Sequence, residues 1–217
     1  MKKMRQSTSL LLAAALCCSA ALSLTGCANN KNTSTPQNDG ETVSYESAYT
    51  PEVPENPVAE NVPGKEIKAE IGEELTYDNK LSIRLNQVIE LDAVDKSQFR
   101  VLLAEMTIVN NSDKKIDCQT LTHFAATIDD KSDDNIVRDV TAGVLARKYY
   151  TKINSSLQSF NQEIAPGETA NGYVHIYAPS TWNDMKLIYK PYKYYNNDQI
   201  VFNIDETKLT HYAEALN

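Results

Sequence analysis

The sequence has few residues of the kinds that cross-link a fold or carry out chemistry. Its 217 residues include four cysteines, three histidines and one tryptophan. So few cysteines provide no disulfide framework, and a packed hydrophobic core must therefore stabilise the fold. The motifs G-x-S-x-G and H-E-x-x-H, which mark serine hydrolases and zinc proteases, are absent, as is a glycine-rich phosphate loop. The sequence thus gives no evidence for an enzyme.

Basic residues are outnumbered by acidic ones. The chain has 21 Lys and Arg against 29 Asp and Glu, a formal net charge of −8. Nucleic-acid binding requires clustered Lys and Arg, so the composition argues against a nucleic-acid partner. The same charge argues against electrostatic attraction to anionic lipids.

One long apolar run is present, and it lies near the N-terminus. Lys2, Lys3 and Arg5 precede SLLLAAALCCSAALSL, and small residues follow the run. This order is typical of a secretory signal peptide. A transmembrane helix needs about 20 apolar residues, a length that the run barely reaches. We expect residues 1–26 to be a signal peptide, whose removal takes away three positive charges and leaves a net charge of −11.

The end of this run, Leu24-Thr25-Gly26-Cys27, resembles the lipobox of bacterial lipoproteins. The resemblance implies cleavage before Cys27 and a thioether-linked diacylglycerol on its sulfur. Two acyl chains hold a protein stably on a bilayer, whereas one chain binds marginally. We therefore expect a lipid anchor at Cys27 and a location on the extracellular face of the cell membrane. Cys118 is then the remaining free thiol.

A proline-rich stretch follows the predicted anchor. Residues 28–64 contain five of the eight prolines, mixed with Asn, Ser, Thr and Glu, and few large aliphatic side chains. Such a composition cannot bury enough apolar surface to offset the entropy of the chain. We predict a disordered spacer over residues 27–66, which as a flexible coil spans about 35 Å.

The remaining residues, 67–217, show the patterns of a β domain. Leu81, Ile83 and Leu85 alternate with polar residues, the period of a half-buried strand. Further strands are predicted in FRVLLAEMTIVN, IDCQTLTHFAATI, MKLIYK and QIVFNI. Pro166-Gly167 suits a type II turn, and the strand after it places Ala170, Gly172, Val174 and Ile176 on one face and Tyr173, His175 and Tyr177 on the other.

Two segments look helical: the region from GVLARKYY to SSLQSF and the tail KLTHYAEAL. Neither is long, so the helical content is minor. Several short strands with turn signals between them favour an all-β sandwich. The predicted architecture is a disordered stalk followed by one antiparallel β-sandwich domain.

Three segments in order carry a resemblance to a known family: EIGEELTYDNKLSIRLNQV, FRVLLAEMTIVNNSDKKI and EIAPGETANGYVHIYAP. They are similar to the uncharacterised domain of unknown function 4352, found in Gram-positive surface lipoproteins. The resemblance covers about Ile67 to Ile204 and implies an immunoglobulin-like sandwich outside the membrane. The family supplies no catalytic residues, and this chain departs from its pattern in an insertion over residues 137–161.

Tyrosine is the one residue type in evident excess, with twelve in the chain. Tyr192, Tyr194 and Tyr195 cluster in KPYKYYNND beside two lysines. Aromatic rings stack on sugars and dominate protein interfaces. These three tyrosines are therefore the candidate ligand surface, while most of the others are expected to be half-buried strand residues.

Other candidates for chemistry are weaker. Cys118 and His123 lie five residues apart, but a small buried hydrophobe is the simpler interpretation of Cys118. The acidic loop from Asp129 to Asp134 lacks the spacing of a calcium loop, and Lys131 interrupts it. We expect no metal or cofactor, although the sequence leaves calcium binding by this loop open.

These observations lead to a membrane-anchored extracellular binding module with a cell-wall or protein partner. Two alternatives remain: a cell-wall carbohydrate-binding protein that uses exposed tyrosines, and a hydrolase without a recognisable motif. A transporter's solute-binding lipoprotein is disfavoured, because it needs two lobes and this chain has residues for one domain.

Overall fold

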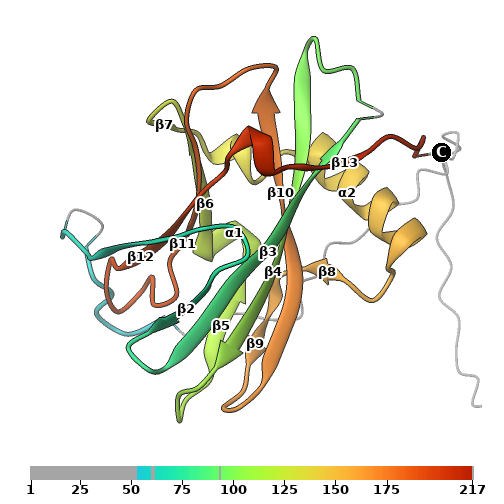
Figure 1. Ribbon diagram of the computed structural model, residues 1–217. Coiled ribbons are helices and arrows are strands. Elements are labelled where there is room, and N and C mark those ends of the chain that lie inside the picture. Colours follow the sequence, from blue (N-terminus) through green and yellow to red (C-terminus); the bar gives the residue numbers. More distant parts are fainter. Residues whose placement is uncertain (1–52, 60–61, 93, 217) are drawn as a thin grey trace, which may run out of the picture. The chain divides into compact units, whose positions relative to one another are not determined.

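The computed structural model describes residues 53–59, 62–92 and 94–216 (Figure 1). The predicted signal peptide, the anchor residue Cys27 and most of the predicted spacer lie outside these residues. Within the described residues, no helix is both long enough and apolar enough to cross a membrane.

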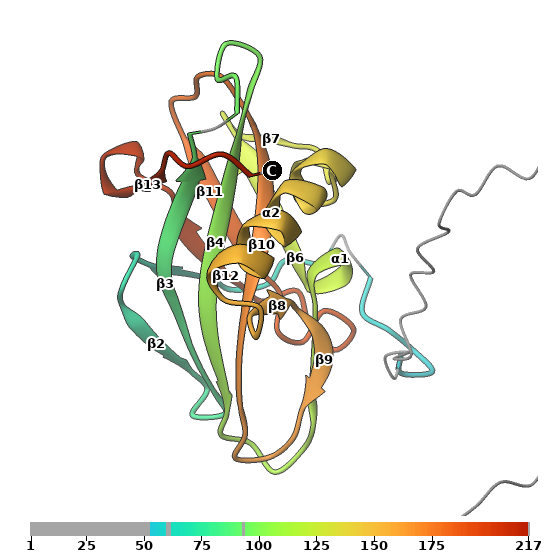
Figure 2. The ribbon, with the colours of Figure 1, turned by 90° about the vertical axis from the view of Figure 1, so that its right-hand side faces the viewer.

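Two β-sheets pack face to face and confirm the predicted β-sandwich (Figures 1 and 2). The first sheet contains, in spatial order, β1 (Glu66–Ala69), β12 (Gln199–Asn203), β11 (Met185–Tyr189), β6 (Phe124–Ile128) and β7 (Lys131–Ser132). The second sheet contains β13 (Thr210–Tyr212), β3 (Leu81–Leu91), β4 (Phe99–Asn110), β10 (Thr169–Pro179) and β8 (Gln158–Ser159), and β2 (Glu74–Tyr77) also pairs with β3. A separate short ladder joins β5 (Ile116–Gln119) to β9 (Asn161–Ile164).

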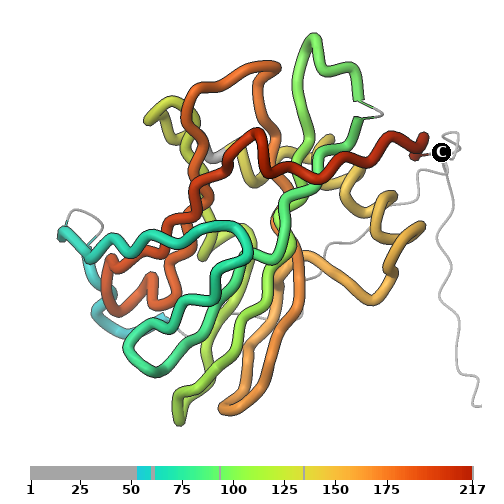
Figure 3. The backbone as a smooth tube through the Cα atoms, in the orientation of Figure 1, coloured from blue at the N-terminus to red at the C-terminus, as the bar shows by residue number. Residues whose placement is uncertain are grey.

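The central pairs are antiparallel, as predicted, but three pairs at the margins are parallel. These are β1 with β12, β13 with β3, and β8 with β10. In the first two pairs the edge strand comes from one of the two ends of the domain's chain. One edge of each sheet is thus formed by a segment distant in sequence from its partner, as the red chain of β13 beside the green chain of β3 illustrates (Figure 3).

The alternation in β3 and β10 sends one face of the second sheet into the core between the sheets. Ala170, Val174 and Ile176 of β10 are buried there with Leu81, Ile83 and Leu85 of β3. A bulge between Leu85 and Gln87 shifts the register of β3 against β4. After the bulge, Val88 joins the inter-sheet core, while Ile89 and Leu91 face the opposite side. Alternation then directs Glu90 toward the inter-sheet side, where its side chain is fully buried.

Helix α2 (Val140–Ile153) covers the other face of the second sheet (Figure 2). Its N-terminus is capped by the Asp139 carboxylate, which accepts a hydrogen bond from the amide of Ala142 at 2.8 Å. The side chains buried beneath the helix form a second hydrophobic cluster: Ile89, Leu91, Val101, Leu103, Ala142, Ala146, Tyr149, Tyr150 and Tyr173. The predicted insertion over residues 137–161 therefore supplies a third layer.

Two sequence-based predictions of local structure are wrong. The segment IDCQTLTHFAATI is not one strand, because the one-turn helix α1 (Thr120–His123) divides it into β5 and β6. The tail KLTHYAEAL is not a helix: it begins at the last residue of the 3-10 turn η2 (Glu206–Lys208) and contains strand β13. Pairing with the edge of β3 and packing of Tyr212 on Tyr149, with ring centroids 4.8 Å apart, override the helical pattern of the tail.

The described part of the proline-rich segment lies along the loop between β11 and β12. The amide of Val58 donates to the carbonyl of Tyr194 at 3.1 Å. The Asn197 side-chain amide donates to the carbonyls of Ala59 and Val62 at 2.8 and 2.5 Å. The first strand then begins at Glu66, one residue before the predicted start of the domain. The chain is therefore fixed to the domain well before its first strand.

Candidate functional site

A polar depression of about 460 Å³ lies at one end of the sandwich. It is built from β3, the loop after β3, the start of β4, the end of β10, η2 and β13. Its lining residues are Glu90, Lys96, Arg100, Ser180, Glu206, Thr207 and His211. The sequence does not reveal this site, because these residues are spread over some 120 positions and form no motif. The one available signal was Glu90, a carboxylate within the apolar stretch VIEL.

The buried ion pair between Glu90 and Arg100 forms the floor of the depression. Arg100 Nε donates to Glu90 Oε1 at 2.6 Å, and Arg100 Nη2 donates to Oε2 at 2.8 Å. Arg100 Nη1 also donates to Glu206, and the indole of Trp182 lies 4.1 Å from the guanidinium carbon. Burial opposes ionisation of Glu90, but hydrogen bonds from Arg100 and Lys96 outweigh it and lower the pKa of this carboxyl group.

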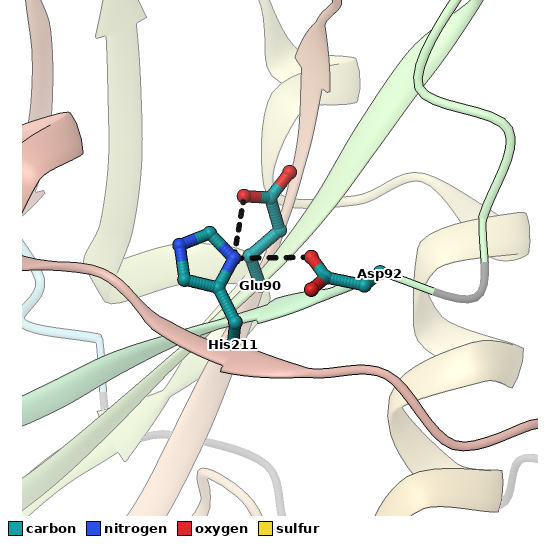
Figure 4. Close-up of side chains that lie close together, drawn as sticks. All are labelled: Glu90, Asp92 and His211. Carbon is teal, nitrogen blue, oxygen red and sulfur yellow. Dashed lines mark hydrogen bonds and ion pairs between the residues drawn. The ribbon is translucent and has the colours of Figure 1, made fainter.

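Lys96, Asp92 and His211 complete the charged network, and Figure 4 shows Asp92 and His211 beside Glu90. Lys96 Nζ lies 2.6 Å from Asp92 Oδ1 and 3.1 Å from Glu90 Oε1. His211 Nδ1 lies 3.1 Å from Asp92 Oδ1 and 3.4 Å from Glu90 Oε2. Possible ligand atoms of Glu90, Asp92 and His211 all fall within 4.8 Å of one another, a spacing compatible with a metal ion. The Lys96 ammonium group, however, already bridges the two carboxylates and supplies the cation there.

The network joins parts of the chain that are far apart in sequence. Glu206 and His211 belong to the C-terminal segment, whereas Glu90, Asp92, Lys96 and Arg100 belong to β3, β4 and their connection. Three carboxylates face one lysine, one arginine and one histidine. Contacts of Arg100 with Glu206, and of His211 with Asp92 and Glu90, therefore fasten the C-terminal segment onto the end of the sandwich.

The three candidate tyrosines lie between β11 and β12 but in different surroundings. Tyr192 packs on Tyr77, with ring centroids 5.9 Å apart, and its hydroxyl is buried without a hydrogen-bond partner among the described residues. The Tyr194 ring contacts His123 edge-on at 6.1 Å. Tyr195 is 64% exposed. Tyr192 is thus partly a core residue, and Tyr194 and Tyr195 form the accessible part of this cluster.

Cys118 lies in β5, and His123 is the last residue of α1. Cys118 is fully buried, and burial raises the pKa of its thiol far above the ordinary value. His123 is also buried, which lowers the pKa of its imidazole to about 4, and its Nδ1 lies 2.9 Å from the Thr122 hydroxyl. A neutral, inaccessible thiol is a poor nucleophile, so Cys118 acts as a core residue.

The acidic hairpin after β6 uses its carboxylates to hold neighbouring backbone and lysine groups. Asp129 Oδ1 accepts hydrogen bonds from the amides of Asn183 and Asp184 at 2.9 and 3.1 Å. These hydrogen bonds lower the pKa of Asp129. Lys186 Nζ lies 3.0 Å from Asp130 and 2.7 Å from Asp184. The carboxylates here are therefore engaged with groups of the protein itself.

Comparisons with known proteins give the fold its context. No family model matches this chain, and no curated protein matches it either. The predicted membership of the domain of unknown function 4352 therefore stays a prediction.

Several solved structures are similar to it at low sequence identity. A Bacillus subtilis protein (ycdA), provisionally described as a lipoprotein, is 14% identical. The match covers 62% of this chain and 40% of that chain, with a TM-score of 0.42. An uncharacterised β-sandwich protein from Clostridium difficile 630 is 17% identical over 66% of this chain and 97% of its own, with a TM-score of 0.37. A Staphylococcus aureus protein, also provisionally described as a lipoprotein, is 14% identical over 65% and 99%, with a TM-score of 0.36. This chain thus spans less than half of the first of these proteins and nearly all of the other two.

Proposed function

We propose that this protein is a lipid-anchored β-sandwich module on the extracellular face of the cell membrane and that its role is binding rather than catalysis. The observation that carries the proposal is Leu24-Thr25-Gly26-Cys27 at the end of a signal-like apolar run. A diacylglycerol thioether on Cys27 provides two acyl chains, enough for stable membrane attachment. The proposal includes membership of the surface-lipoprotein family that the three strand motifs resemble.

The geometry of the polar depression supports binding over catalysis. General acid–base catalysis needs a carboxyl or imidazole group that can reach a substrate proton. Here Glu90 is buried and held by Arg100 on both carboxylate oxygens, and Asp92 is held by Lys96. The thiol of Cys118 is equally enclosed. These two carboxylates and this thiol are therefore engaged in holding the fold.

Intact mass spectrometry of the protein purified from membranes tests the anchor. The wild-type chain is expected to start at Cys27 and to carry the mass of a diacylglyceryl group. A Cys27→Ala variant should lack that mass and leave the membrane fraction. An unmodified wild-type chain, or one cleaved elsewhere, would contradict the proposal.

Carbohydrate binding is the second candidate, and the exposure of Tyr195 is the observation in its favour. Its test is retention on purified peptidoglycan by the wild type, by Tyr194→Ala with Tyr195→Ala, and by a Tyr192→Phe control. Loss of retention in the double variant alone would support sugar stacking. Equal retention of all three proteins would refute a role for these rings.

A further inference from the structure

The exposed large hydrophobic side chains of the described residues are confined to a few segments. Val53 and Val62 belong to the N-terminal segment, and Tyr195 to the loop beside it. Leu121, which is 57% exposed, lies on α1. The other three lie on α2: Val140, which is 74% exposed, Val144 and Ile153. We call the surface formed by residues 53–59 and 62–65, α1, residues 137–153 and residues 190–197 the apolar face.

Direct contacts join the segments of the apolar face to one another. The amide of Val58 donates to the carbonyl of Tyr194, which joins the N-terminal segment to the loop. The Tyr194 ring lies against His123 of α1. Arg138 Nη2 donates to the carbonyl of Leu121 at 2.8 Å, which joins α1 to the start of α2. Figure 2 shows α1 and α2 on the same side of the molecule.

The apolar face is also basic, in contrast to the rest of the protein. Its described residues include two acidic side chains, Glu55 and Asp139. The basic side chains are Lys65, Arg138, Arg147, Lys148, Lys152, Lys190 and Lys193. With Glu60, which the sequence places within the N-terminal segment, these segments carry a net charge of +4 on a chain whose overall net charge is −8. One of the seven basic side chains, Lys152, is ion-paired with Glu214 at 2.9 Å. Exposed aliphatic side chains beside Lys and Arg on a helix are the pattern of a surface that lies on anionic lipid.

The chain leaves the domain from this same surface. Val53, the first described residue, lies 26 positions after Cys27, and 26 residues reach at most about 90 Å. An anchor at Cys27 would keep the apolar face at high local concentration near the bilayer. A weak affinity of that face for lipid would then be enough to orient the domain.

We infer that the apolar face lies against the anionic bilayer that holds the Cys27 anchor, so that the domain rests on the membrane by a defined side. This inference rests on the proposed lipid anchor. It also replaces the expectation, drawn from net charge alone, that the protein has no electrostatic attraction to anionic lipid. The polar depression and the β2–β3 side are then left for partners in the extracellular space.

The test places a fluorescent reporter on the lipidated full-length protein in vesicles. Single cysteines at Val140→Cys and Leu121→Cys probe the apolar face, and Asp113→Cys, in the turn between β4 and β5, is the control. Each is labelled with an environment-sensitive dye and reconstituted in phosphatidylglycerol–phosphatidylcholine vesicles that contain a quencher on the acyl chain. Labels at 121 and 140 should shift to shorter wavelengths and be quenched, whereas the label at 113 should not.

A charge reversal separates electrostatic docking from simple proximity. Arg147→Glu with Lys148→Glu should remove most of the wavelength shift at position 140. Lys80→Glu with Lys114→Glu, which changes the net charge equally outside the apolar face, should leave the shift intact. Vesicles of phosphatidylcholine alone should give a smaller shift than the anionic vesicles.

The outcomes distinguish this inference from the proposed function. Protein that floats with the vesicles but gives the same emission at 113, 121 and 140 would overturn the membrane-facing surface and leave the anchor standing. Wild-type protein that fails to float would overturn both. A label at 140 that is shielded by cell-wall fragments but not by vesicles would assign the apolar face to a wall partner and overturn the inference.

Discussion

The guanidinium group of Arg100 donates two hydrogen bonds, of 2.6 and 2.8 Å, to the carboxylate of Glu90. Both side chains are buried: that of Arg100 is 8% exposed and that of Glu90 is 1% exposed. Lys96 and His211 approach the same carboxylate from the side. A buried charge of this kind is tolerated only while its partners remain in place.

Removal of Arg100 should therefore destabilise the protein strongly. Arg100→Met leaves the Glu90 carboxylate buried without its main partner, and we expect a loss of about 3 kcal/mol in the free energy of unfolding. The double variant Glu90→Leu with Arg100→Met should lose less, because no buried charge is left uncompensated. Urea titration of the three proteins measures the difference.

A matched control for this prediction is the exposed ion pair between Glu66 and Lys68, at 3.6 Å. Lys68→Met should change the free energy of unfolding by less than about 1 kcal/mol, as is usual for surface pairs. If Arg100→Met cost no more than Lys68→Met, the buried pair would not have the structural role described here.

Stability should fall as the pH is lowered from 6.5. Burial lowers the pKa of His123 to about 4 and also lowers the pKa of His175. In the unfolded chain both imidazoles titrate near their ordinary pKa of about 6.5. Between pH 6.5 and 4 the unfolded state binds more protons, so stability is fully present above about pH 6.5 and is lost as the pH falls toward 4.

For His123 the loss amounts to about 3 kcal/mol at the end of this range. The lowered pKa values of Glu90 and Asp92 add a further loss at lower pH, as these carboxylates become protonated. Urea titrations at pH 7, 6 and 5 measure the slope. His123→Asn should flatten the slope, and an unchanged slope in this variant would show that His123 is not the group responsible.

Cys118 should resist alkylation in the folded protein. Its thiol is fully buried and its raised pKa disfavours the reactive thiolate. Iodoacetamide should leave native protein unmodified under conditions that label the urea-unfolded chain completely, as read by mass spectrometry. The cysteine of Val140→Cys provides an exposed control that should react in the native state. Full labelling of native Cys118 would contradict its placement in the core.

Gly64 should be needed to hold the N-terminal segment on the domain. A Cβ atom at this position would lie 2.0 Å from the backbone carbon and oxygen of Asn197, so the two segments would have to separate. We expect Gly64→Ala to speed tryptic cleavage after Lys65, with a loss in the free energy of unfolding of about 1–2 kcal/mol.

Gly72→Ala is the control for this effect. Gly72 has a φ of 85°, which strains an alanine, but no described atom beyond its two chain neighbours lies within 4 Å of its added Cβ. It should therefore destabilise the turn before β2 without changing cleavage after Lys65. Equal cleavage rates in the two variants would show that contact with Asn197 does not hold the segment.

The sequence allowed the sandwich and its core to be predicted, because burial imposes a strict alternation on a strand. Leu81, Ile83 and Leu85 mark the core face of β3, and the opposite orientations of Val174 and Tyr173 mark the two buried faces of β10. The same rule could not predict the tail. Tyr212 packs on Tyr149, more than 60 residues earlier, and the local pattern contains no trace of that contact.

The polar depression could not be predicted from the sequence for a similar reason. Glu90 reaches the inter-sheet side only because of the bulge at Leu85–Gln87, and its partner His211 arrives on a strand that pairs in parallel with β3. In the tyrosine cluster, by contrast, residues adjacent in sequence have different surroundings in the fold. Three neighbouring tyrosines look alike in sequence, but Tyr192 faces the core while Tyr195 faces solvent.

The second sheet separates two hydrophobic clusters that share no side chains. As a result, α2 can open without exposing the core between the sheets, and its amides should exchange with solvent hydrogen earlier than those of β4 and β10. The helical layer and the sandwich are then two cooperative units of unequal stability. Changes of sequence within α2 can remodel one side of the molecule while the sandwich beneath it stays folded.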